Sequence, residues 1–134
     1  MKPILLDTDV LSHYLNNEST TVLYAEKYIQ EFRQLSISII THYEVLNGLY
    51  YRDARRRLIV FEKFTALHQI LPLTLESVEI SARIFADLRQ TGRPIGHTDT
   101  LIAGVAMANG MQLATNNTAH FERIEGLELV NWTK

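Results

Sequence analysis

Residues 4–15 read ILLDTDVLSHYL, and this stretch defines the first structural unit of the chain. The apolar run that ends at Leu6 predicts a short buried strand over residues 3–6, and the apolar spacing of residues 10–15 predicts a helix. Asp7 and Asp9 fall between the two. An acid at such a junction either caps the helix or belongs to a site.

The rest of the chain alternates short apolar runs with amphipathic stretches. The run SISII at residues 36–40 is β-branched and predicts a second strand. Further strands are predicted at residues 70–73, 112–115 and 127–131, and further helices at residues 22–35, 41–51, 53–67, 75–89 and 98–108. This alternation predicts one α/β domain over residues 1–134, with a mainly parallel central sheet flanked by helices.

The composition of the chain limits the class of protein. The 134 residues are 46% hydrophobic, which suits one domain with one core. There is no cysteine, so disulfides and thiolate metal sites are excluded, and we expect a cytoplasmic protein with no membrane span. The formal net charge is −2, so any contact with nucleic acid must come from a local basic patch.

Three acids follow predicted strands or begin the helices after them. Asp7 follows the first strand, Glu44 lies at the start of the helix after SISII, and Asp99 begins the helix TDTLIAGVAMA. In an open α/β sheet, sites form beyond the carboxyl ends of the strands. We therefore expect these three acids to share one site.

Helix capping is the alternative for each acid. Thr41 and Glu44 have the spacing of a capping box. Thr98 and Asp99 look like an N-cap and a first-turn acid. The acids after the first strand could cap the next helix in the same way, so the residues alone leave both interpretations open.

A shared site would need a cation. Clustered carboxylates raise one another's pKa, and a divalent ion removes that conflict. Oxygen-only ligands favour Mg²⁺ or Mn²⁺ over Zn²⁺, and no HExxH spacing supports zinc. One such ion supplies a Lewis acid, and a pair roughly 3.5–4 Å apart can also activate water for phosphodiester hydrolysis.

Three segments give the chain a specific resemblance. ILLDTDVL, SIITHYEVLNGL and GRPIGHTDTLIAGVAMANGMQLATNNTAHFERIEGL occur in the order found in PIN-domain ribonucleases, and they look most like VapC toxins of bacterial toxin–antitoxin pairs. The resemblance implies a metal-dependent endoribonuclease with Asp7, Glu44 and Asp99 as its acidic core. It implies that Asp7 and Asp99 bind the metal directly and that Glu44 binds it directly or through water. It also implies a VapB-type antitoxin as partner and a homodimer.

One segment departs from the family pattern. The family often supplies a fourth acid around TNNTAHF, where this chain has Asn116, Asn117 and His120 and no acid before Glu122. Because the fourth acid is missing, the site could hold either one metal ion or two. The candidate auxiliary residues are Asp9, Thr115, Asn117 and Glu122.

A basic stretch, DARRRL at residues 53–58, is the candidate RNA contact. Arginines on phosphates supply affinity without sequence readout. The candidate residues are Arg52, Arg55, Arg56, Arg57 and Arg93. The alternative for this basic stretch is a solvated helix face.

The apolar stretch at residues 22–32 is either ordinary core or part of a groove for a partner.

Two other functions remain as alternatives to the ribonuclease. One is a PIN-like binding module with impaired catalysis, which the missing fourth acid suggests. The other is an aspartyl-phosphate phosphatase of the haloacid dehalogenase type, because ILLDTDVL would place Asp7 as its nucleophile. That phosphatase also needs a late Gly-Asp pair, which this chain lacks.

Overall fold

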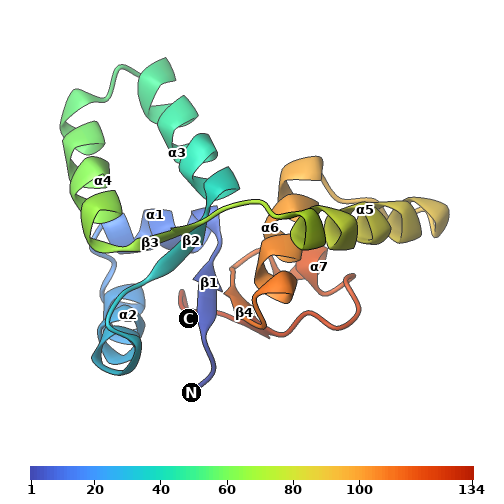
Figure 1. Cartoon of the computed structure of the whole chain (residues 1–134). Coiled ribbons are helices and arrows are strands. Elements are labelled where there is room, and N and C mark those ends of the chain that lie inside the picture. The colour runs from blue at the N-terminus through green and yellow to red at the C-terminus, as the bar shows by residue number, and fades with distance from the viewer.

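The computed structural model describes residues 1–134, in which strands and helices alternate along the chain (Figure 1). The five strands are β1 (Ile4–Leu6), β2 (Ser36–Ser38), β3 (Gln69–Leu71), β4 (Gln112–Ala114) and β5 (Leu129–Val130). They form one sheet in the order β3-β2-β1-β4-β5, and every neighbouring pair is parallel. The prediction of a parallel α/β sheet is confirmed.

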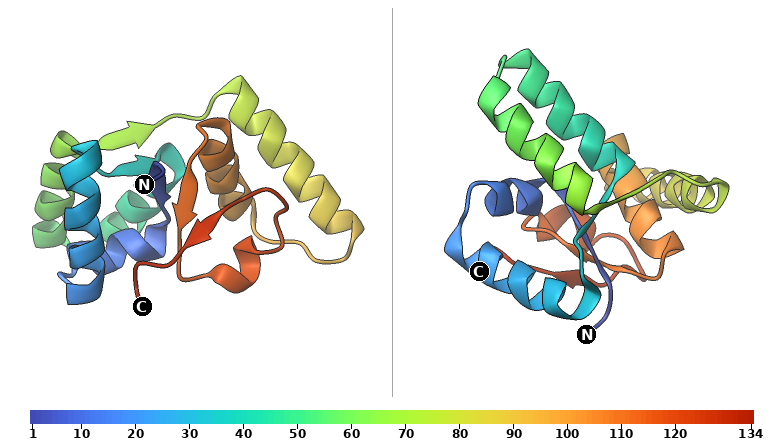
Figure 2. Two further views of the ribbon diagram at one scale, coloured as in Figure 1. Left: turned by 90° about the horizontal axis from the view of Figure 1, so that it is seen from below. Right: turned by 60° about the vertical axis from the view of Figure 1, so that its left-hand side comes forward.

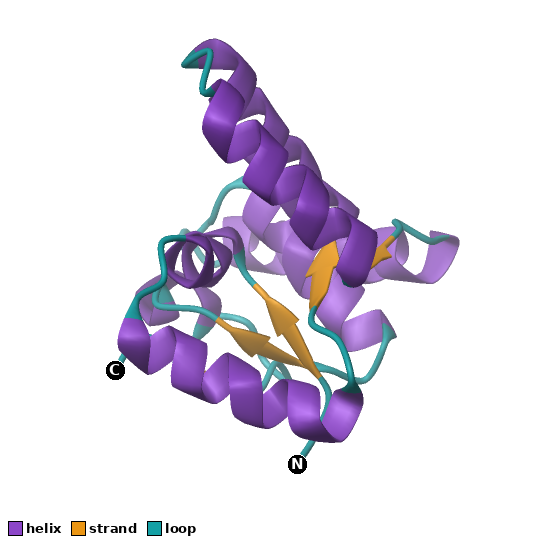
Figure 3. Cartoon of the chain, turned by 90° about the vertical axis from the view of Figure 1, so that its left-hand side faces the viewer, coloured by secondary structure: helices purple, strands orange, loops and turns teal.

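Seven helices connect and cover the strands. They are α1 (Thr8–Leu15), α2 (Ser19–Phe32), α3 (Ile39–Tyr51), α4 (Arg55–Leu67), α5 (Leu75–Gln90), α6 (His97–Ala108) and α7 (Thr118–Phe121). Helices lie on both sides of the strands (Figure 3). The hairpin of α3 and α4 and the helix α5 extend away from the sheet in different directions (Figure 2). None of these helices combines the length and the apolar character needed to cross a membrane.

The central strand β1 separates two hydrophobic cores. Side chains alternate across a strand, so Ile4 and Leu6 face one side of the sheet and Leu5 faces the other. Ile4 and Leu6 pack in a core that includes Leu11, Tyr28 and side chains of α3 and α4. Leu5 packs in a second core built from α5, α6 and α7. Burial on both faces fixes β1 in the middle, with its carboxyl end between α1, α3 and α6.

Helix starts differ most from the sequence predictions. The first helix begins at Thr8 rather than at residue 10, because the Asp7 side chain accepts a hydrogen bond from the Thr8 N–H at 2.8 Å and caps it. The strand predicted over residues 36–40 ends at Ser38, whose hydroxyl accepts from the Thr41 N–H at 3.1 Å and starts α3 at Ile39. The prediction that Thr41 and Glu44 form a capping box is therefore wrong, because Ser38 is the N-cap of α3.

Other boundaries move by one to three residues. Glu44 lies in the second turn of α3 rather than in the first. Helix α6 begins at His97 with Gly96 as its N-cap, so Thr98 is not the cap. Helix α2 covers Ser19–Phe32 instead of residues 22–35, and the short helix α7 was not predicted.

Candidate functional site

Asp7 is a buried acid at the carboxyl end of the central strand. Its side chain is 6% exposed. One carboxylate oxygen accepts from the Thr8 N–H at 2.8 Å, and the other accepts from the Thr115 hydroxyl, also at 2.8 Å. Thr115 directly follows the neighbouring strand β4, so two adjacent strand ends build this contact. No Lys, Arg or His forms an ion pair with Asp7.

The buried position and the acidic neighbours of Asp7 disfavour its ionised form and raise its pKa. Burial is the main cause that raises this pKa from 3.8 to about 7. The charge of Asp9 and, more weakly, the charge of Asp99 act in the same direction, while the hydrogen bonds from Thr115 and Thr8 oppose them. Asp7 and Asp99 are therefore close enough for the charge of one to act on the other.

Glu44 is linked to Asp7 through one threonine. The Thr8 hydroxyl donates to Glu44 Oε1 at 2.7 Å, while the Thr8 N–H holds Asp7. The hydroxyl oxygens of Thr8 and Thr41 lie 3.1 Å apart. Thr8 thus connects the acid of the first strand to the acid of α3. This role of Thr8 was not predicted from the sequence, although its position between Asp7 and Asp9 was a signal for it.

Asp99 is half-buried in the first turn of α6 and faces the segment after β4. Its Oδ2 lies 3.5 Å from His120 Nδ1. The Asn117 side-chain amide donates to the same His120 nitrogen at 3.0 Å, and the Asn117 N–H donates to the Thr115 hydroxyl at 2.9 Å. Residues 115–120 therefore contact Asp99 at one end and, through Thr115, Asp7 at the other.

The auxiliary candidates have different positions. Asp9 accepts hydrogen bonds from the backbone N–H groups of Val10 at 2.7 Å and Asn116 at 3.0 Å, so each of its oxygens has a backbone donor. Asn117 contacts His120 rather than an acid. Glu122 is exposed at the end of α7 and forms no hydrogen bond or ion pair through its side chain.

The donor chemistry of this site fits a hard divalent cation. The acids offer only carboxylate oxygens, and the buried Asp7 has repelling neighbours and no cationic partner. However, no three Asp, Glu or His side chains converge on a point from which they could hold an ion. The residues therefore match Mg²⁺ or Mn²⁺ in ligand type, while their side chains are not arranged around one centre.

A groove opens beside Glu44, between α1, α3 and α4. Its volume is about 290 Å³, and its lining includes Thr8, Glu44 and Phe61 together with Arg52 and Arg57. Two of the predicted RNA-contacting arginines thus share a groove with the second acid.

The other predicted arginines lie elsewhere. Arg55 pairs with Asp53 at 3.1 Å, and Arg56 is exposed without a hydrogen bond or an ion pair. Arg93 lines a different cavity, between α5 and residues 123–125. The structure does not bring these three next to the acids.

The profile of the PIN domain family matches residues 4–127 of this chain. The tRNA(fMet)-specific endonuclease VapC of Shigella flexneri is 31% identical over 134 residues, which covers 99% of this chain and 100% of that protein. The chain belongs to the VapC branch of the PIN-domain family. The VapC ribonuclease Y4jK of Sinorhizobium fredii is 33% identical and covers 96% of both chains.

Solved structures agree with this assignment. The DNA-bound VapBC of Salmonella typhimurium matches with a TM-score of 0.86 and 29% identity, over 98% of this chain and 99% of that one. VapBC2 of Rickettsia felis, bound to a promoter DNA fragment, also gives 0.86, at 25% identity over 96% and 98%. The chain is thus a VapC-family ribonuclease toxin, which favours the PIN interpretation of ILLDTDVL over the phosphatase.

Proposed function

We propose that this VapC-type ribonuclease hydrolyses RNA at a site that Asp7, Glu44 and Asp99 form with Mg²⁺ or Mn²⁺. The observation that carries the proposal is the buried carboxylate of Asp7, which has acidic neighbours and no cation beside it. An ionised group in such a place is costly unless an opposite charge joins it. A divalent cation supplies that charge.

Each acid has its own task in the proposed reaction. Asp7 and Asp99 hold the ion, which when bound polarises the phosphate and lowers the pKa of water. Two hydrogen bonds fix the orientation of the Asp7 carboxylate before the ion arrives. Glu44 Oε1 is held by Thr8, which leaves Oε2 without a partner in the fold and able to take a proton from the attacking water.

The RNA is proposed to approach along the groove that Arg52 and Arg57 line beside Glu44. Their guanidinium groups can contact backbone phosphates, which positions the strand without reading its sequence. The relatives from Shigella and Salmonella are named for their specificity toward tRNA(fMet). Initiator tRNA is therefore the first substrate to test.

The same groove is the proposed contact for a VapB-type antitoxin. The solved neighbours are toxin–antitoxin complexes. The groove reaches Glu44, and its apolar lining includes Leu15, Val60 and Phe61, so a partner segment seated there would cover the acid. Residues 22–32, for which both core and a partner groove were open, bury Ala25 and Tyr28 in the core, while Leu23 and Tyr24 stay exposed. The homodimer stays a prediction.

A cleavage assay with matched variants tests the proposal. Purified protein is incubated with labelled initiator tRNA and with total RNA, in Mg²⁺, in Mn²⁺ and in a chelator. We expect cleavage by the wild type with either metal, none with the chelator, and none by Asp99→Asn. Asp87→Asn is the control, because Asp87 is an exposed acid on α5 that lines a different cavity. Cleavage by a folded Asp99→Asn would remove that residue from the site, and binding of RNA without cleavage would support the binding module instead.

A further inference from the structure

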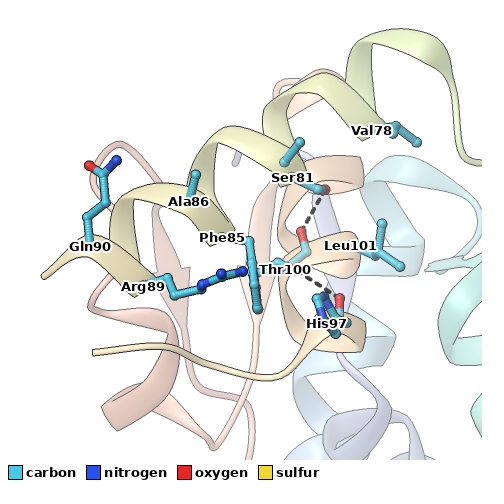
Figure 4. Close-up of a pocket in the computed structure, with 10 residues that line it drawn as sticks. Val78, Ser81, Phe85, Ala86, Arg89, Gln90, His97, Thr100 and Leu101 are labelled. Carbon is cyan, nitrogen blue, oxygen red and sulfur yellow. Dashed lines mark hydrogen bonds between the residues drawn. The ribbon is translucent and has the colours of Figure 1, made fainter. Parts of the chain in front are cut away.

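A second groove lies between α5 and α6, next to the helix end that carries Asp99. Its volume is about 570 Å³, within the range of roughly 300–1,000 Å³ that is usual for ligand sites. Figure 4 shows Arg89 of α5 pointing toward the ring of Phe85, which lies beside His97 of α6. Leu101 also lines the groove. The acidic core uses none of these four residues.

The groove combines an aromatic pair with an unpaired cation. The rings of Phe85 and His97 stack with centroids 4.1 Å apart at an angle of 23°. The Arg89 guanidinium lies 6.0 Å from the centre of the Phe85 ring and forms no ion pair or hydrogen bond with the chain. Phe85 is half-buried and belongs to neither hydrophobic core, unlike its neighbours Ile84 and Leu88.

The charge of the groove is one-sided. Its ten lining residues include Arg89 and His97 and no Asp or Glu. The cavity on the other side of α5 is different, because Glu79, Asp87 and Glu125 line it together with three arginines. An anionic ligand is therefore complementary to the first groove and not to the second.

The groove and the acidic core flank the same end of α6. His97 and Asp99 are two residues apart in its first turn, which places them roughly 200° apart around the helix axis. A strand that passes the start of α6 would contact Asp99 on one side and the Phe85–His97 pair on the other. The two sides of α6 are about one helix diameter apart, ~10 Å, so a strand of one or two nucleotides can span them.

From these observations we propose that the α5–α6 groove binds a nucleotide of the RNA strand next to the bond that is cleaved. This proposal rests on the proposed function. The base packs on the outer face of the exposed His97 ring, which Phe85 supports from the other side at 4.1 Å, because every base offers a face for stacking on an aromatic ring. Arg89 contacts the adjoining phosphate, as a guanidinium without a carboxylate partner can do.

Binding and kinetics of four proteins test this assignment. They are the wild type, Arg89→Gln, Phe85→Leu and the control Arg83→Gln, which removes an exposed arginine of the same helix from the other cavity. Fluorescence anisotropy with a short labelled single-stranded RNA of randomised sequence, in chelator, gives the affinity. Cleavage of initiator tRNA in Mn²⁺ gives kcat and KM. Phe85→Leu keeps an apolar side chain, and Arg89→Gln alters an exposed residue, so each variant is expected to fold.

We expect Phe85→Leu to weaken RNA binding by at least about fivefold, the lower end for the loss of one stacked base. Arg89→Gln should weaken it by at least a similar factor, because a charged contact to a phosphate is lost. KM should rise by a similar factor, with kcat unchanged, and Arg83→Gln should match the wild type. If the wild type cleaves RNA and both groove variants behave like it, this assignment fails while the proposed function stands. If the wild type neither binds nor cleaves RNA, the proposed function fails first. If the variants change only the molecular mass in solution, the groove is an interface between copies of the chain.

Discussion

Replacing Asp7 by Asn should stabilise the protein in the absence of metal. The folded-state pKa of about 7, against an ordinary value of 3.8, means that ionised Asp7 lowers the free energy of unfolding at neutral pH. At about 1.4 kcal/mol for each pKa unit, the penalty is roughly 4 kcal/mol. The amide must turn one donor toward Thr115, where the carboxylate accepted a hydrogen bond, and this costs about 1–2 kcal/mol. The expected net gain is about 2 kcal/mol.

The pH dependence follows from the direction of the shift. A carboxyl group with a raised folded-state pKa binds more protons in the folded protein than in the unfolded chain between pH 4 and 7. The contribution of Asp7 to the free energy of unfolding of the wild type should therefore decrease as the pH rises from 4 to 7. Above pH 7 it should stay level. The advantage of Asp7→Asn should be largest at pH 8 and should shrink at pH 5.

Urea unfolding in chelator at both pH values measures this advantage. Asn caps helices about as well as Asp, so Asp7→Asn keeps the cap of α1, whereas Asp7→Ala loses it and about 0.5–2 kcal/mol with it. Added Mg²⁺ should stabilise the wild type more than either variant. A variant Asp7→Asn that is no more stable than the wild type at pH 8, with the same difference at pH 5, would show that burial and acidic neighbours do not raise the pKa of Asp7.

Three further predictions concern the surroundings of the site. Thr8→Val keeps the fold but frees Glu44, and it should lower RNA cleavage about 10–100-fold, as measured by kcat/KM; an unchanged rate would show that Thr8 does not orient the acid. Gly104→Ala should destabilise the protein by about 2–3 kcal/mol in urea unfolding, because the new methyl group would lie 1.9 Å from the Ser81 hydroxyl oxygen. A variant as stable as the wild type would show that α5 can shift away from α6 without loss of stability. His120→Glu restores an acid beside the carboxylate of α6, so calorimetry should show tighter Mg²⁺ binding, and weaker binding would place that residue outside the metal's reach.

The order of strands and helices was predictable because it rests on apolar periodicity. The run before Asp7 and the first three residues of SISII became parallel strands of the central sheet. The starts of the helices were less predictable, because they depend on which polar side chain turns back onto the backbone. Ser38 and Thr41 are both good caps by residue type, and only the path of the chain after β2 makes Ser38 the cap.

The proximity of the proposed site acids was predictable for a topological reason. Parallel strands bring their carboxyl ends to one edge, so Asp7 and the first turn of α6 had to lie near each other. The contacts that orient these acids were not predictable, because they join segments far apart in the chain. The hydrogen bond from Thr115 to Asp7 spans 108 residues, and the approach of His120 to Asp99 depends on α7, which is too short to have a periodic signal. Asp7 also shows that capping does not exclude a role in the proposed site, since the carboxylate that caps α1 is also the buried acid with acidic neighbours.

The proposed reaction depends on a divalent cation held by the carboxylates of Asp7 and Asp99. Anomalous scattering from a crystal soaked in Mn²⁺ tests it most directly, because the peak locates the ion without reference to activity. We expect a peak in contact with both Asp7 and Asp99, near Glu44, which is absent from crystals of Asp99→Asn. A peak elsewhere on the protein, or none at saturating Mn²⁺ in well-ordered crystals, would contradict it.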